Sequence, residues 1–280
     1  MATLNLVDPS QSDISYKISR FPDGQQNVVL ESRSVDKFHE VCIKARLNNW
    51  RDLELIVCAV ACLRECGLQH ISLYVPYIVG ARSDRKFETG GNNYVRDVIA
   101  PVINSLGFFR VTCLDPHSDV LEACIKNFRK QDNSYLVRFS LSKIDNKDGA
   151  QSRVALISPD AGALKKIYDV AKYFTISNVT TASKVRDIQT GNIVRTELPT
   201  MDLDGIEHFV IIDDICDGGR TFIELAKEIR KQTDKPIYLI VSHGIFSAGF
   251  DELSKHFKGV FCTNSYSEIS HPLVSQLNVF

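Results

Sequence analysis

Two adjacent aspartates, Asp213 and Asp214, have the spacing best suited to holding a polar ligand in this chain. They follow the apolar run Phe209–Ile212, whose β-branched residues predict a buried strand of a parallel sheet that ends at the carboxylates. The loop Asp217–Thr221 comes next and leads into a helical pattern, for which Thr221 is the predicted cap. A glycine turn that opens a helix leaves backbone N–H groups free to hold a phosphate. The alternative is an ordinary strand-to-helix turn with solvated aspartates, because such short loops recur by chance.

A second stretch suited to anions follows another predicted strand, Ile71–Tyr77. The sequence ARSDRK places Arg82, Arg85 and Lys86 within five residues, just beyond that strand. Ligands of open α/β sheets bind at the carboxyl ends of the strands, so this position favours an anion site. The alternative is a solvated basic loop, which is the usual fate of a run of charges.

Further polar side chains also stand where predicted strands end. They are Asp115 and His117 after residues 110–114, Asp160 after residues 154–158, and His243 after residues 236–241. A single histidine is more often structural than a ligand, but with an Asp and a His at one strand end a metal or phosphate role weighs about as much as a structural one. The whole set predicts a phosphate-rich, magnesium-dependent site between two α/β halves.

The elements that position these side chains alternate between strands and helices, which is typical of an α/β fold. Two strands around a turn are expected over residues 15–31, and helices are expected over 51–66, 94–106 and 119–131. The pattern weakens between residues 131 and 152. The predicted boundary therefore separates an N-terminal domain, 1–144, from a C-terminal domain, 145–280.

The C-terminal half repeats the same order of elements. A helix over 164–173 and a strand over 173–179 precede the polar segment 180–200, which is longer than a connection requires. We interpret that segment, which holds Lys184 and Arg186, as a mobile excursion. The last clear predicted strand covers residues 259–263.

Composition sets further bounds on function. The chain has 280 residues, 44% of them hydrophobic. Its formal net charge of -1 gives no indication of the broad basic surface that nucleic-acid-binding proteins carry. Its eight cysteines form no CxxC pair, and Cys58, Cys62 and Cys66 share one helix face, where small buried apolar residues are the expected role. No leader or membrane-spanning run is present in the sequence, so we expect a soluble, cytoplasmic protein with reduced thiols and no membrane partner.

Six landmarks in order, FPDGQ, ARSDRK, DPHS, ISPDAG, VIIDDICDGGRT and SHGIF, resemble the ribose-phosphate diphosphokinases, or phosphoribosyl pyrophosphate (PRPP) synthetases. They span residues 21–246. The resemblance implies two phosphoribosyltransferase-like halves, each a mainly parallel sheet flanked by helices. It also implies transfer of diphosphate from MgATP to the anomeric hydroxyl of ribose 5-phosphate, with release of AMP.

The resemblance also implies roles for matching residues. For ATP these are Phe21, Asp23, Gln25, Arg82, Ser83, Asp84 and His117; for Mg2+, His117 and Asp160; for the sugar phosphate, Asp213, Asp214, Asp217, Gly218, Gly219, Arg220 and Thr221; and for catalysis, Lys184 and Arg186. Phe21 and Gln25 would reach adenine from a neighbouring subunit of a homo-oligomer. Two cations on a loop with little packing suit the closing of that loop over the transferring group.

The chain departs from the family pattern inside its most family-like motif. Gly218 replaces a hydroxyl-bearing residue, Arg220 replaces a glycine, and Ser83 stands where the family usually has Gln. The missing side chain opens space and the guanidinium can pair with a phosphate, so a larger acceptor such as ADP-ribose is an alternative to ribose 5-phosphate. A non-catalytic nucleotide-binding homologue and a transferase that consumes PRPP are the other candidates. Retention of Lys184, Arg186, His117 and Asp160 together argues against the first, and the lack of a base-binding hood argues against the second.

Overall fold

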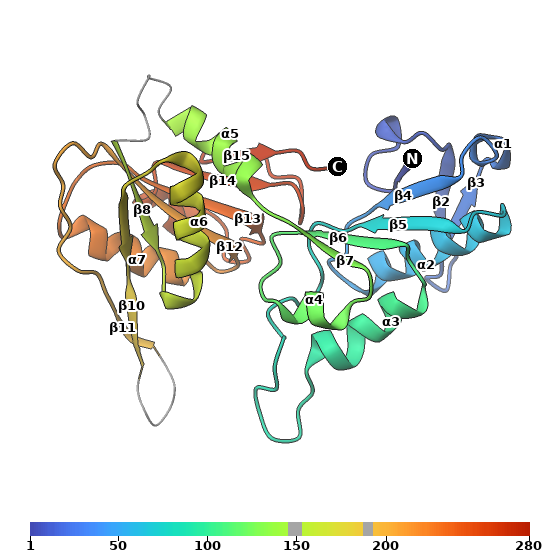
Figure 1. Ribbon diagram of the computed structural model, residues 1–280, viewed down its shortest axis with the longest axis horizontal. Helices are drawn as coiled ribbons and strands as arrows, with labels where there is room; N and C mark the ends of the chain where they lie inside the picture. The colour runs from blue at the N-terminus through green and yellow to red at the C-terminus, as the bar shows by residue number, and fades with distance from the viewer. Residues whose placement is uncertain (145–152, 187–192) are drawn as a thin grey trace. The chain divides into compact units, whose positions relative to one another are not determined.

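The computed structural model describes residues 1–144, 153–186 and 193–280, with backbone alone for 184–186 and 193–195. The chain divides into two compact units, 1–132 with 279–280, and 133–278 (Figure 1). Both are α/β units built on parallel sheets, so the predicted fold class is confirmed. The units divide at 132/133, and the helix α5 (Ser134–Ile144) packs in the core of the second unit.

Unit 1 contains a five-stranded parallel sheet in the order β1-β4-β5-β6-β7. Its strands are β1 (Ala2–Asn5), β4 (Glu40–Lys44), β5 (His70–Tyr74), β6 (Arg110–Leu114) and β7 (Phe128–Gln131). The antiparallel hairpin of β2 (Tyr16–Arg20) and β3 (Gln26–Leu30) forms a separate two-stranded sheet. The helical elements are η1 (Pro9–Gln11), α1 (Ser32–Val35), α2 (Trp50–Glu65), the π-helical turn η2 (Val95–Ile99), α3 (Ala100–Ser105) and α4 (Val120–Cys124).

Unit 2 contains a six-stranded parallel sheet in the order β15-β14-β13-β12-β8-β9. Its strands are β8 (Val154–Ser158), β9 (Asn178–Thr181), β12 (His208–Cys216), β13 (Ile237–Gly244), β14 (Gly259–Thr263) and β15 (Val274–Leu277). A separate antiparallel pair joins β10 (Ser183–Arg186) to β11 (Ile193–Glu197). The helical elements are α5, η4 (Ala161–Ala163), α6 (Leu164–Phe174), α7 (Arg220–Arg230) and α8 (Asp251–His256).

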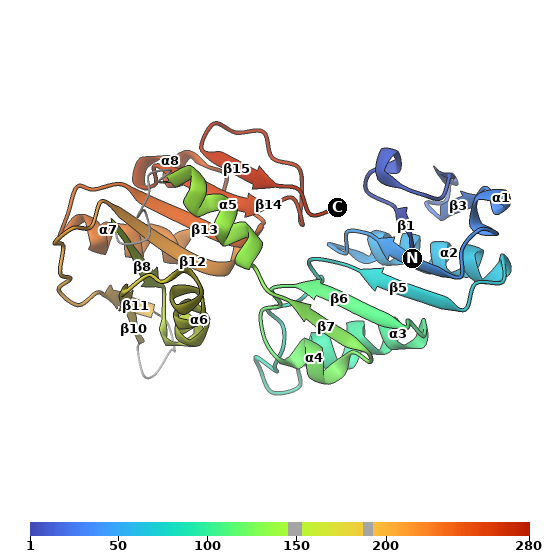
Figure 2. The ribbon, with the colours of Figure 1, turned by 45° about the horizontal axis from the view of Figure 1, so that its top comes forward.

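Helices cover both faces of the unit 2 sheet (Figures 1 and 2). Phe209 and Ile211 of β12 pack with α7 and α8, while Val210 and Ile212 pack with α5 and α6. Successive side chains of a strand point to opposite faces, so a continuous apolar run is what a strand covered on both sides requires. The prediction of a buried strand over 209–212 is confirmed.

Several predicted boundaries were wrong. The helix expected over 119–131 ends at Cys124, because Asn127 adopts a left-handed conformation (φ 56°) and the chain re-enters the sheet as β7. The strand expected from Tyr173 begins only at Asn178, because α6 runs on to a left-handed Thr175. The strand β15 follows the predicted last strand, and β10 and β11 lie in the segment expected to be an excursion.

Candidate functional site

The aspartate pair lies within β12 and not beyond its end, which corrects the sequence prediction. Pairing of β12 with β8 stops at Ile211, but pairing with β13 continues through Asp213 to Cys216. The two carboxylates therefore stand where the strand has a single neighbour. Asp214 donates its backbone N–H to Oδ1 of Asp213 at 2.9 Å and is itself buried.

The environment of Asp213 favours its protonated form. Burial is the main cause of its raised pKa, and the neighbouring charge of Asp214 adds to it. The positive charge of Lys166, on α6, acts in the opposite direction. Sequence reasoning missed Lys166, because a lysine in an amphipathic helix has no local signal that separates it from a solvated one. A half-buried pair that holds an extra proton can both accept and donate hydrogen bonds, as ribose hydroxyls require.

The loop after β12 presents backbone donors. Gly219 is left-handed (φ 79°) and caps α7 through its carbonyl, which accepts from the N–H groups of Phe222 and Ile223 at 3.0 Å. Thr221 lies inside the helix, so its prediction as the cap was wrong. The N–H groups of residues 218–221 donate to no residue that the structure describes. Successive free N–H groups at a helix N-terminus form an anion-binding concavity.

A neighbouring loop supports the loop over residues 217–221. The N–H groups of Ile245 and Phe246 both donate to the carbonyl of Cys216, at 2.8 and 3.2 Å. The hydroxyl of Ser247 donates to Oδ1 of Asp217 at 2.5 Å. Asp217 therefore supports the loop through its side chain, and the open space lies over Gly218, which is exposed.

Arg220 adds a cation to the same loop. It is the first residue of α7, it is exposed, and its guanidinium contacts no hydrogen-bonding or acidic group in the described part of the chain. A cation at a helix N-terminus is unfavourable, because the N-terminal N–H groups already carry partial positive charge. The position is therefore better explained by an anion outside the chain than by helix stability.

Asp160 has a structural role in this structure. Its Oδ1 accepts the N–H groups of Gly162 and Ala163, at 2.9 and 3.2 Å, so the side chain caps the turn that leads into α6. These bonds use one carboxylate oxygen and fix the direction of the other. Among the described residues no cluster of three or more His, Cys, Asp or Glu side chains is arranged to hold a metal ion.

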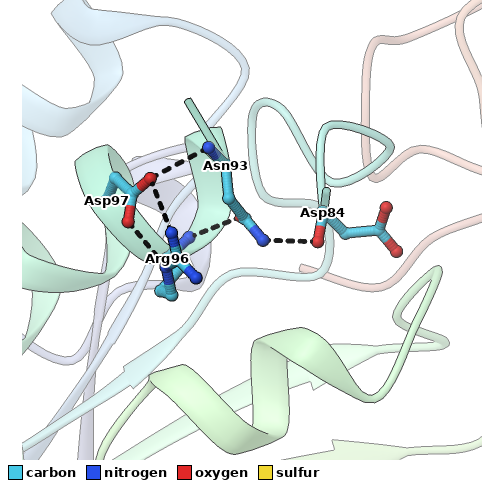
Figure 3. A network of polar contacts seen from close by, with 4 residues as sticks. All are labelled: Asp84, Asn93, Arg96 and Asp97. Atoms are coloured by element: carbon cyan, nitrogen blue, oxygen red, sulfur yellow. Dashed lines mark hydrogen bonds and ion pairs between the residues drawn. The ribbon is translucent and has the colours of Figure 1, made fainter. Parts of the chain in front are cut away.

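In unit 1, the loop that carries Arg82, Ser83 and Asp84 is anchored by Asn93 (Figure 3). Asn93 Nδ2 donates to the carbonyl of Asp84 at 2.5 Å, and its Oδ1 accepts the N–H of Arg96 at 2.9 Å. Asp97 completes the network by accepting from the N–H of Asn93 and from the guanidinium of Arg96, which lowers the pKa of Asp97 to about 2.

Asn93 is the other residue that sequence reasoning missed. The available signal was an Asn directly before a helical pattern, which marks a capping position. Gly80 contributes at the other end of the loop: it is left-handed, and a Cβ there would lie 2.2 Å from the ring of Tyr94.

The loop of Asp115 and His117 leaves the same sheet edge as the Arg82 loop. The two are joined at their bases, because Leu114 donates its N–H to the carbonyl of Pro76 at 3.2 Å. Asp115 is buried and left-handed (φ 44°), a strained conformation that turns the chain sharply and leaves His117 exposed.

The remaining unit 1 residues form a tight hairpin turn. Phe21 donates its N–H to the carbonyl of Gln25, and Gly24 donates to the carbonyl of Phe21, both at 2.9 Å. Asp23 Oδ1 accepts the N–H of Gln25 at 3.1 Å, so Asp23 shapes the turn. The side chain of Phe21 is 49% exposed, which leaves its ring free to stack on a ligand.

Lys184 and Arg186 lie on β10, opposite Thr196 and Ile193 of β11. Their side chains lie outside what the structure describes, and so do residues 187–192, part of the predicted excursion. No helix in the described residues has the length and apolar character needed to cross a membrane.

Comparisons with known proteins show which family and fold this chain resembles. The profile of the phosphoribosyl transferase domain matches residues 129–272. The chain is 28% identical to the ribose-phosphate pyrophosphokinase of Mycoplasmopsis pulmonis, over 82% of this chain and 70% of that protein. It is 27% identical to ribose-phosphate pyrophosphokinase 2, chloroplastic, of Spinacia oleracea, over 94% and 66%. It is 25% identical to the ribose-phosphate pyrophosphokinase of Pyrococcus abyssi, over 90% of this chain and 84% of that protein.

One solved structure has the same fold over most of the chain. The phosphoribosylpyrophosphate synthetase of Mycobacterium smegmatis superposes with a TM-score of 0.77 at 16% identity, covering 95% of this chain and 86% of that one. The likeness therefore extends over both units taken in order, and not only over the part that the domain profile matches.

Proposed function

Because the chain belongs to the phosphoribosyl transferase domain family, as a divergent relative of the ribose-phosphate pyrophosphokinases, we propose that it is a diphosphotransferase. The anomeric hydroxyl of a ribose 5-phosphate compound attacks the β-phosphorus of ATP. The bond between that phosphorus and the oxygen bridging to the α-phosphate breaks, and AMP leaves. The hydroxyl proton passes to solvent. The observation that carries the proposal is the row of free N–H groups at residues 218–221, which follows the half-buried Asp213 and the buried Asp214 in the chain.

The acceptor is bound by unit 2 in this proposal. Its 5-phosphate accepts from the N–H groups of Gly218, Gly219, Arg220 and Thr221, and its ring hydroxyls bond Asp213 and Asp214. Asp217 keeps the loop open for the phosphate through its bond to Ser247. A pre-formed set of donors costs little reorganisation when the anion arrives, so the sugar is held with its anomeric hydroxyl in a fixed place.

ATP is bound by residues of unit 1. The exposed ring of Phe21 stacks on adenine and Gln25 reads its edge, while Arg82, Ser83 and Asp84 meet the phosphates. His117 and Asp160 would hold Mg2+, which neutralises phosphate charge when it is bound. The donor set is compatible with that ion only if ATP oxygens complete its shell, because one oxygen of Asp160 already caps a turn. Lys184 and Arg186 stabilise the charge on the transferring group.

The test is a measurement of AMP release from ATP with each acceptor in turn. Ribose 5-phosphate should give AMP and a product with a diphosphate at the anomeric carbon, detectable by phosphorus NMR. A protein that binds ATP and yields no AMP with any sugar phosphate would be a non-catalytic homologue. Consumption of added PRPP in the presence of a nucleobase would identify a phosphoribosyltransferase, which uses PRPP as a substrate and does not make it. Asp214→Ala serves as the inactive control.

A larger acceptor, such as ADP-ribose, is the second candidate. Arg220 favours it, because this exposed cation stands two residues after Gly218, where an added Cβ would meet nothing nearer than 3.9 Å. The space suits a second phosphate esterified to the first, and the guanidinium suits its charge.

Replacing Arg220 by Gly and Gly218 by Thr gives this loop the family's usual side chains. If the larger acceptor is the substrate, the double variant should lose about tenfold to a hundredfold in kcat/KM for ADP-ribose, the size of one or two charge-assisted hydrogen bonds. Its kcat/KM for ribose 5-phosphate should not fall. A wild-type preference for ribose 5-phosphate would eliminate this candidate.

A further inference from the structure

Three half-buried side chains on one face of α2 bond the backbone of β3. Glu54 Oε1 accepts the N–H of Gln26 at 3.0 Å, Cys58 Sγ donates to the carbonyl of Gln26 at 3.6 Å, and Cys62 Sγ donates to the carbonyl of Val28 at 3.2 Å. The spacing of four residues brings these side chains above one another on a helix. They form a row, here called the α2 row, which follows the free edge of the strand.

The edge that the α2 row contacts has no strand beside it. The hairpin of β2 and β3 forms a sheet of two strands among the described residues, and Gln26 and Val28 point their backbone groups away from β2. A two-stranded hairpin is marginally stable by itself, and unmatched N–H and C=O groups at a buried edge are costly. The α2 row therefore supplies the bonds that a third strand would otherwise provide.

The thiols are suited to this donor role. Burial raises the pKa of Cys58 and of Cys62, so both keep the proton that they donate. The nearby carboxylate of Glu54 acts in the same direction on Cys58. The bonding pattern explains why polar side chains of this small size occupy the face: an aliphatic residue would fill the space and leave the carbonyls of β3 unmatched.

The row ends one residue from the hairpin turn. Gln26, which takes two of the three bonds, directly follows the turn Phe21–Gln25. We propose that Glu54, Cys58 and Cys62 are positioning residues that hold this turn in the orientation in which Phe21 and Gln25 meet adenine. The inference rests on the proposed function of the turn, and it adds α2 as the element that controls ATP affinity.

The experiment compares Glu54→Ala with Glu54→Gln in the full chain. Glu54→Ala should speed amide exchange of residues 16–30 about tenfold and raise KM for ATP about tenfold, at nearly unchanged kcat and acceptor KM, the size of one charged hydrogen bond. Glu54→Gln keeps an acceptor oxygen and should restore both values to within about threefold of the wild type. Cys62→Ala should act in the same direction more weakly, and Cys62→Ser should restore it. Cys66→Ala is the control, because its thiol bonds no residue in the described ranges.

The variant Phe21→Ala distinguishes a failure of the positioning role from a failure of the proposed ATP-binding role of the turn. If Phe21→Ala raises KM for ATP but Glu54→Ala does not, the positioning role is refuted and the proposed function stands. Unchanged amide exchange in Glu54→Ala also refutes the positioning role. If exchange accelerates while neither Phe21→Ala nor Glu54→Ala changes KM, the turn does not bind ATP, and both the role of Phe21 and the inference fail.

Discussion

Replacing Gly219 by alanine should destabilise the second unit by up to about 2.5 kcal/mol. Gly219 is left-handed at φ 79°, a conformation that costs an L-residue about 1 to 2 kcal/mol. The new Cβ would lie 3.1 Å from Cδ2 of Leu253, so this buried side chain must shift by a few tenths of an ångström, adding up to about 1 kcal/mol. The lower entropy of the unfolded alanine chain returns about 0.4 to 1 kcal/mol.

Gly218→Ala is a matched control from the same loop. Its backbone is not left-handed, and its added Cβ would meet Ser247 Oγ at 3.9 Å, an ordinary contact. Its stability should therefore equal that of the wild type or rise slightly. Urea unfolding followed by circular dichroism measures both variants, and the midpoint of Gly219→Ala should fall at an unchanged slope. Equal midpoints for the two variants would refute the assignment of strain to Gly219.

Three further predictions concern single side chains. The raised pKa of Asp213 means that the folded chain binds this proton more tightly than the unfolded chain, so the protein loses stability as pH rises above about 4. Asp213→Asn removes that loss and should stabilise the protein by about 1 to 3 kcal/mol at neutral pH, with no gain at pH 3. Thermal unfolding measured across this pH range checks the prediction. A larger gain in acid would contradict this sign. Asn93→Ala should weaken ATP binding, measured by calorimetry, and cost about 1 to 2 kcal/mol of stability; Asn93→Asp keeps the acceptor for Arg96 and should recover the stability without the ATP affinity. Lys184→Ala should cut turnover at least about a hundredfold while equilibrium ATP binding stays the same, and a surviving turnover would remove its catalytic role.

The fold and the candidate site loops follow from local sequence patterns in the places where one signal dominates. The continuous apolar run over 209–212 could belong only to a strand covered on both faces, and the structure has it there. The six landmarks predicted the family, which the domain profile and the relatives confirm. In each case the residues that carry the signal are neighbours in sequence.

Features that depend on distant residues could not be predicted in the same way. The strand β12 passes through Asp213 and Asp214 because β13 continues beside it, a pairing that no residue near Asp213 encodes. The cysteines of α2 were interpreted as small apolar residues, and their bonds to β3 depend on where the hairpin lies. Lys166 affects Asp213 from a different helix, and a lysine in a helix carries no mark of such a role.

The two units use different means to shape their loops, and this difference determines where substitutions will act. In unit 1 the Arg82 loop is held by Asn93, which lies just before the helical turn η2, and the Phe21 turn is held by the α2 row. In unit 2 the loop over 217–221 is shaped by a left-handed glycine and by backbone bonds to Cys216. Changes in these unit 1 side chains should therefore alter ATP affinity, while the acceptor should be chosen by the few positions of the unit 2 loop that tolerate a side chain. Gly218 and Arg220 are such positions, since neither is needed for the fold of the loop, and both depart from the family pattern.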